Sequence, residues 1–142
     1  MTSERVSLET LGAWVIKCNP RHTPVEPMVS AGHTAPRWCV ADNYRTRLMR
    51  PGQRVLLWVT TRPDRGIWGV GRITGDVAVA DGRHRVPVHI PLLPEPLTAA
   101  QLRTSPDLAS LEVFRVPVQS NPSWATVAEM TVIDTLLPDS VQ

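Results

Sequence analysis

The chain is poor in lysine, tyrosine, phenylalanine and cysteine. Among 142 residues there are one tyrosine, one phenylalanine, two cysteines and one lysine, Lys17, against fourteen arginines. Cys18 and Cys39 are too few for a disulfide framework, so reduced thiols and a cytoplasmic location are expected. The sequence has no run of about 18 apolar residues and starts with a polar segment, which predicts neither a membrane span nor a secretion signal.

Length and composition predict one globular domain. At 15.7 kDa with 42% hydrophobic residues, residues 1–142 can bury a single core, with residues 1–11 as a partly ordered lead-in. The excess of arginine is what a GC-rich coding sequence produces. A lysine retained against that bias is a weak indication of a position that requires a compact ammonium.

Short strand-like segments dominate the sequence. They are rich in β-branched and aromatic residues and are separated by turns containing proline, glycine or asparagine. Residues 19–36 hold four prolines and are expected to form a long loop. Strands are expected at 12–18, 38–41, 54–61, 67–74 and 111–116, with two more within 76–93.

Helix signals are local and few. Thr98 to Gln101 and Thr126 to Glu129 are capping boxes, the second opening a helix that ends near Leu137. Ser105-Pro106 offers a further helix start, and a helical turn is expected over 44–49. Because strands and helices do not alternate, the sequence predicts an α+β protein with a small, mostly antiparallel β-barrel, flanked by short helices and a C-terminal helix.

Five segments occur in an order that resembles a known family. They read W-V-I-K-C-N-P from Trp14, R-W-C-V-A-D-N-Y from Arg37, P-G-Q-R-V-L-L-W-V, G-I-W-G-V-G-R-I-T-G and Q-S-N-P-S-W-A-T-V-A-E-M. This order is similar to the EVE domains, a branch of the PUA-like barrels related to YTH and ASCH domains. Asn19 and Cys39-Val40 depart from the family pattern, which usually has an acidic residue at the first position and a small polar residue and glycine at the second.

The resemblance implies a domain that binds DNA or RNA through a single, often modified, nucleobase in an aromatic pocket. No cofactor or metal is implied, and neither a membrane nor a particular oligomeric state. Trp38 corresponds to the tryptophan that borders the pocket. The other predicted ligand-binding residues are Lys17, Asn19, Asn43, Tyr44, Trp68, Ser120 and Asn121.

A base can be bound by the residue types in this block. An aromatic side chain that stacks on a base contributes about 1–3 kcal/mol, and amides can bind its polar edge. The predicted contacts to the nucleic-acid backbone are Arg45, Arg47 and Arg50. Taken alone, Trp38 is more typical of a core residue. Asn43 and Tyr44 are as typical of a helix cap and a half-buried tyrosine as of base contacts, and the arginines are typical of a solvated face.

Three other interpretations stay open. Cys18, His22, His33 and Cys39 could form a zinc site, although their spacing is irregular. Related ASCH domains include small amidohydrolases that act on modified cytidine and need a lysine, a threonine and a glutamate close together. Lys17 fits that set, but the central block offers no matching glutamate. A domain that binds only proteins is the third interpretation.

Overall fold

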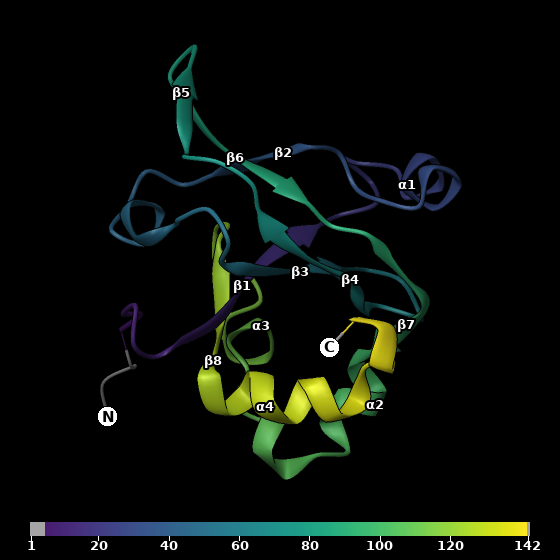
Figure 1. Cartoon of the computed structure of the whole chain (residues 1–142). Helices are drawn as coiled ribbons and strands as arrows, with labels where there is room; N and C mark the ends of the chain where they lie inside the picture. Colours follow the sequence, from purple (N-terminus) through teal and green to yellow (C-terminus); the bar gives the residue numbers. More distant parts are fainter. Residues whose placement is uncertain (1–4, 142) are drawn as a thin grey trace.

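The computed structural model describes residues 5–141. It is an α+β structure in which a curled, mixed sheet forms a half-barrel flanked by short helices (Figure 1). The strands are β1 Leu11–Cys18, β2 Arg37–Val40, β3 Arg54–Val59, β4 Gly66–Ile73, β5 Ala78–Ala80, β6 Arg83–His89, β7 Leu92–Thr98 and β8 Ser123–Thr126. The helices are α1 Glu26–Ala31, α2 Ala99–Arg103, α3 Glu112–Arg115 and α4 Val127–Leu136, with 3₁₀ turns η1 Thr46–Leu48, η2 Pro106–Leu108 and η3 Asp139–Val141.

The sheet runs in the order β2-β6-β4-β3-β1-β8, with β5 added beside β6 and β7 beside β4. β1 and β3 are parallel, and the other recorded strand pairs are antiparallel. The expectation of an α+β chain built on a curved, mostly antiparallel sheet is therefore confirmed at this level.

Alternate residues of the central strands face two different cores. In β1, Trp14, Ile16 and Cys18 belong to an inner core inside the curl of the sheet, whereas Ala13 and Val15 belong to an outer core. The outer core is completed by apolar residues of α2, η2, α3 and α4, which lie together below the sheet in Figure 1. Each large aliphatic side chain buried here contributes about 1.5–3 kcal/mol.

Both predicted capping boxes are confirmed. Thr98 and Gln101 exchange side-chain and backbone hydrogen bonds at the start of α2, and Thr126 and Glu129 do the same at α4. These motifs satisfy N–H groups that the first helical turn leaves without partners. α4 follows β8 directly, so the capping box also turns the chain out of the sheet.

Four segments differ from the sequence prediction, among them residues 92–98, which form β7 where no strand was predicted beyond residue 93. The loop over 19–36 contains α1, whose Pro27 lies in the first turn, where a missing N–H costs nothing. A strand was predicted over 111–116, but Glu112–Arg115 form α3 there, because contacts made by this segment to distant residues outweigh its strand-like pattern. Residues 123–126, for which no strand was predicted, form β8.

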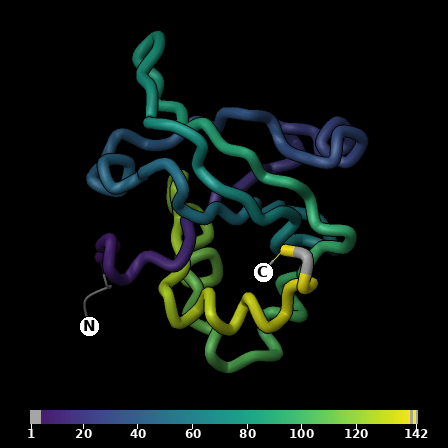
Figure 2. Tube along the Cα trace, viewed as in Figure 1, coloured from purple at the N-terminus to yellow at the C-terminus, as the bar shows by residue number. Residues whose placement is uncertain are grey.

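The β5–β6 hairpin stands away from the rest of the molecule, at the top of Figures 1 and 2. Its turn is at Asp81 and Gly82, as the sequence predicted, and both residues have positive φ. β6 continues from this hairpin into the sheet, where it pairs with β2. In the described part of the predicted lead-in, the side chain of Val6 is buried in the inner core. Within residues 5–141, no helix is both long and apolar enough to cross a membrane.

Candidate binding site

A hollow of about 410 Å³ opens where the end of β1 approaches β2. A volume of this size lies within the range that small-molecule sites occupy. We call it the large hollow, and its lining combines one aromatic ring, two amides, two thiols and several basic groups. The lining residues are Lys17, Cys18, Asn19, His22, Thr23, Ala35, Arg37, Trp38, Cys39 and Asn121.

Trp38 forms an aromatic wall of the large hollow. It is half-buried, packs against the inner core, and its indole N–H donates to the Thr34 hydroxyl at 3.3 Å. In the register of β2 and β6, Trp38 lies opposite Val86, a fully buried residue, which fixes the strand that carries it. The ring therefore has both a packed and an open environment, as a stacking wall requires.

Asn121 joins the last loop of the chain to the end of β1. Its side-chain oxygen accepts the Lys17 backbone N–H at 2.9 Å, and its NH₂ group donates to the Lys17 carbonyl at 3.1 Å. The amide thus continues the pairing of β1 with β8, which ends in register at Val15 and Ser123. Because a side-chain amide can make four hydrogen bonds, Asn121 keeps one donor and one acceptor for a ligand.

A second, smaller hollow of about 280 Å³ adjoins the first. The two share Lys17, Asn19 and Asn121, and the small hollow is completed by Thr60, Pro117 and Gln119. Along β1, Lys17 has the same parity as Val15, so its side chain lies on the outer face of the sheet. Its ammonium donates there to the carbonyl oxygens of Pro117, at 3.3 Å, and Gln119.

A buried ion pair lies close to Lys17. Arg45 makes two parallel hydrogen bonds to Glu112, at 2.6 and 2.8 Å, and a third to the carbonyl oxygen of Pro122 at 3.0 Å. Burial lowers the pKa of Lys17, the charge of Glu112 raises it, and that of Arg45 lowers it. The pKa of Arg45 is raised, chiefly by its hydrogen bond to Glu112.

Arg45 was predicted to contact nucleic-acid phosphates, and the structure gives its guanidinium a protein partner instead. With side chains only 11% and 7% exposed, Arg45 and Glu112 form a structural link between η1 and α3. Of the other two predicted arginines, Arg47 is exposed and lies 3.4 Å from Asp42. Arg50 is exposed and donates to the backbone carbonyls of Arg47 and Met49. None of the three lines a hollow described here.

Asn43 and Tyr44 lie apart from Trp38's hollow. The Asn43 side-chain oxygen accepts the backbone N–H groups of Arg45, at 2.9 Å, and Thr46. The Tyr44 hydroxyl accepts the Val6 backbone N–H at 3.2 Å, and the ring lies under the Arg5 guanidinium. Both residues thus make the structural contacts that the sequence left open as the alternative.

Trp68 and Ser120 are also placed elsewhere. Trp68 is buried, its indole N–H donates to the Asp64 carbonyl at 3.0 Å, and Arg62 stacks over its ring. It borders a separate, mainly apolar hollow of about 380 Å³ beside Leu92 and Pro94. Ser120 is exposed and borders neither hollow beside Lys17. The structure therefore gathers Lys17, Asn19, Trp38 and Asn121.

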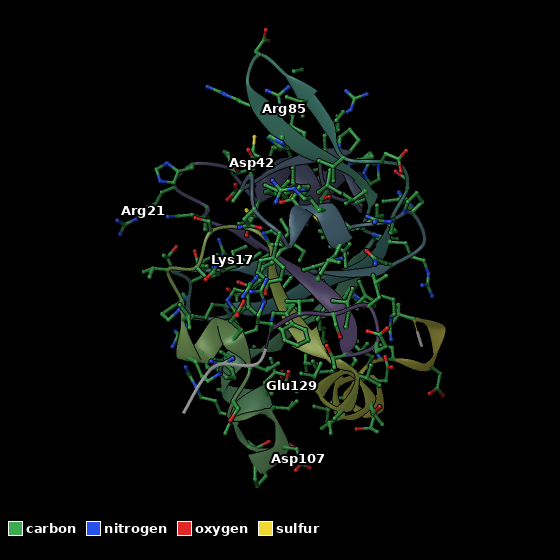
Figure 3. All side chains as sticks on the ribbon, turned by 90° about the vertical axis from the view of Figure 1, so that its left-hand side faces the viewer. Lys17, Arg21, Asp42, Arg85, Asp107 and Glu129 are labelled. Carbon is green, nitrogen blue, oxygen red and sulfur yellow. The ribbon has the colours of Figure 1, made fainter. Side chains whose placement is uncertain are left out.

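Several lining residues were not predicted as ligand contacts. Cys39 and Arg37 flank Trp38 on β2 and line the large hollow, although alternation along a strand predicts their side chains on the face opposite that of Trp38. Thr60 follows β3, which pairs with β1 up to the register of Cys18 and Val59. His22 lies in the loop after β1, and no sequence pattern in that loop predicts where its side chain lies. Figure 3 shows Lys17 on this side of the molecule, with Arg21 projecting outward near it and Asp42 and Arg85 above it.

The two thiols have different environments. Cys18 is buried, its Sγ lies 3.5 Å from the Thr23 carbonyl oxygen, and burial raises the pKa of its thiol to about 11. Cys39 is exposed. Among the described residues, no three His, Cys, Asp or Glu side chains are grouped as metal ligands would be. His33, a member of the zinc set considered above, stacks obliquely with His89 at 5.9 Å.

Comparisons with known proteins give information on the fold of this chain and none on its function. No family model matches the chain, and no curated protein matches it in sequence. A protein from Pseudomonas syringae superposes with a TM-score of 0.68 at 16% identity, covering 87% of this chain and 98% of that one. One from Rhodopseudomonas palustris gives 0.68 at 20% identity, covering 93% and 99%. A protein from Leishmania major, titled hypothetical, gives 0.66 at 17% identity, covering 92% and 96%.

Proposed function

We propose that the chain binds DNA or RNA by holding one extruded, modified nucleobase against Trp38. The observation that carries the proposal is the large hollow, in which an aromatic wall faces amide and basic groups. A planar base offers a face for stacking and a polar edge for hydrogen bonds. Binding must also offset the cost of removing the base from its stack, a few kcal/mol.

Asn121 and Asn19 are the proposed contacts to the polar edge of the base. Asn121 retains a donor and an acceptor after clamping Lys17, and its orientation is fixed by that clamp. Asn19 uses its side-chain oxygen to accept the Arg21 backbone N–H at 3.0 Å, which leaves its NH₂ group for a ligand. A polar group held in place before the ligand arrives loses less entropy on binding.

The proposal includes the PUA-like fold of EVE domains. Its support is the half-barrel topology together with the ordered segments that bring Trp38, Lys17 and Asn121 to one place. Exposed Arg37 borders the large hollow. Exposed Arg21 lies in the loop after β1, between the lining residues Asn19 and His22. These two replace Arg45 as the proposed phosphate contacts at the rim.

Trp38→Ala tests the proposal directly. Loss of the stacking wall is expected to weaken binding of oligonucleotides with modified bases by about 1–3 kcal/mol, or roughly 5- to 150-fold in Kd. Trp38→Phe retains an aromatic face and should lose less. Binding is measured by fluorescence anisotropy at stated salt, with single- and double-stranded probes that carry defined methylated bases and unmodified controls.

Stability measurements separate a binding role from a packing role. Urea unfolding of Trp38→Ala shows whether the fold persists, and Arg103→Gln on α2 serves as a charge control away from the hollow. Equal affinity of wild type and a folded Trp38→Ala for every probe would reject the stacking assignment. Absence of binding by the wild type to any probe would reject the proposed function as a whole.

A hydrolase acting on modified cytidine is the second candidate. The observation that favours it is Glu112, which acts electrostatically on Lys17, with Thr60 at the same small hollow. Both carboxylate oxygens of Glu112 accept hydrogen bonds from Arg45, which argues against a role as a free base. Release of acyl groups from N4-acylated cytidines, abolished by Lys17→Ala, would favour the hydrolase over the binding domain.

A further inference from the structure

We propose that the small hollow binds the phosphate group attached to the nucleotide whose base stacks on Trp38. This inference rests on the proposed function, since the base fixes where the phosphate must lie. It assigns the two adjoining hollows to two parts of one ligand. The assignment follows from the sharing of Lys17, Asn19 and Asn121 by both linings, which makes the hollows continuous over the end of β1.

The small hollow offers hydrogen-bond donors suited to phosphate oxygens. The Lys17 ammonium has three N–H groups, and within residues 5–141 two carbonyl oxygens accept from it, which leaves one for a ligand. The side-chain amides of Asn19 and Gln119 supply further N–H groups, whereas the Thr60 hydroxyl already donates to the Cys18 carbonyl at 3.3 Å. An ammonium held in one place by two carbonyls loses little further freedom when a phosphate binds.

The charge balance at this place favours an anion. Among the residues that line the two hollows, Lys17 and Arg37 carry positive charge and none is a carboxylate. Glu112, which acts on Lys17, is already paired with Arg45. A base alone has no charge that would require the ammonium. A nucleotide supplies that charge, and bonds between ammonium and phosphate are stronger than those between neutral groups.

The two sides of β1 explain how one ligand can reach both hollows. Cys18 faces the inner core on the side of Trp38, whereas Lys17 faces outward toward α3. Asn19 and Asn121 lie at the strand end, where a ligand can pass from one side to the other. The base would stack on the inner side and its phosphate would turn outward over the strand end.

The test compares a nucleoside with its own monophosphates by isothermal titration calorimetry. The probe is the modified nucleoside that binds best among those screened, with its 5′- and 3′-monophosphates. One of the two monophosphates is expected to bind at least 10-fold more tightly than the nucleoside. Lys17→Met should remove most of that advantage. Gln119→Leu is the second variant, should Lys17→Met not fold, and should reduce the advantage partially. Arg103→Gln is the control.

The outcomes separate the two proposals. If the nucleoside binds and both monophosphates bind no better, the phosphate site is refuted while the base pocket stands. If no nucleoside binds, inorganic phosphate titrated against ¹⁵N-labelled protein provides the remaining arm. Shifts of the Gln119 and Asn121 amides that Lys17→Met abolishes support the small hollow as a phosphate site even though the proposed function has failed. If phosphate causes no shifts, or shifts that Lys17→Met leaves unchanged, the base pocket and the phosphate site are both refuted.

Discussion

Breaking the Arg45–Glu112 pair is expected to destabilise the fold strongly. The two side chains are 11% and 7% exposed and share two hydrogen bonds, so removing one partner leaves a buried charge without compensation. Losses of about 3–5 kcal/mol are typical of such changes. Against a total stability of about 5–15 kcal/mol for a domain of ordinary size, this is a large fraction. We expect such losses for both Arg45→Met and Glu112→Gln.

A double-mutant cycle measured by urea unfolding checks the magnitude. If the pair acts as a unit, the double variant should lose clearly less than the sum of the single variants, with a coupling of about 1–3 kcal/mol. Arg47 and Asp42 provide a matched control, because their ion pair lies at the surface with side chains 70% and 64% exposed. Arg47→Met should change stability by less than about 1 kcal/mol.

The reasoning would be refuted by one result in particular. If Arg45→Met keeps the wild-type unfolding midpoint and slope but loses affinity for oligonucleotides, its guanidinium contacts phosphate and the ion pair is not a structural link. That outcome would restore the role that the sequence suggested for Arg45. Loss of stability and retained affinity at low denaturant would confirm the structural interpretation.

Three further predictions concern buried and exposed polar groups. Cys39 should react with iodoacetamide at neutral pH in the folded protein while Cys18 reacts only after unfolding, as peptide mass spectrometry would show. Because burial raises the pKa of the Cys18 thiol from 9.0 to about 11, the unfolded state ionises first as pH rises. The stability that wild type gains over Cys18→Ala should therefore be complete below pH 9 and decline by about 2–3 kcal/mol toward pH 11; a pH-independent difference in urea unfolding would contradict this. Ser123→Ala should keep or raise stability by up to about 1 kcal/mol, because within the described residues its buried hydroxyl has no hydrogen-bond partner; a loss above about 1 kcal/mol would indicate an unrecognised partner.

Local signals predicted the parts of the fold that depend on neighbouring residues. The capping boxes at Thr98 and Thr126 and the turn at Gly82 each need only a few adjacent side chains, and all three occur as expected. The strand predicted over 111–116 was wrong because its structure depends on Arg45, which lies far away in sequence. No pattern within the segment distinguishes an alternating strand from a short helix fixed by such a contact.

The candidate site was predicted in part for the same reason. The structure places four predicted site residues at the large hollow, Lys17, Asn19, Trp38 and Asn121. The prediction grouped them through the resemblance, because composition and spacing alone contain no spatial relation between them. Asn43 was placed at the site because it is close to Trp38 in sequence. In the structure, the Asn43 side chain points to the start of η1, where its oxygen accepts the backbone N–H groups of Arg45 and Thr46. Closeness along a chain is a poor guide to closeness in space once a strand has ended.

The position of β1 in the sheet has a consequence for how the protein is made. β1 pairs on one side with β3 and on the other with β8, so Trp14 has Val55 and Trp124 as its two partners. During synthesis β1 is made before both of its partners, and one of its edges stays unpaired until β8 has been translated. Contacts between such distant segments slow folding, and an open edge can pair with other chains.

Asn121 arrives with that last strand, and it completes both hollows. Under the proposed function, competence to bind a ligand therefore requires that β8 has paired with β1. A chain ending before residue 120 would lack the clamp on Lys17 as well as β8. Its exposed β1 edge would favour aggregation over a stable, partly functional fragment.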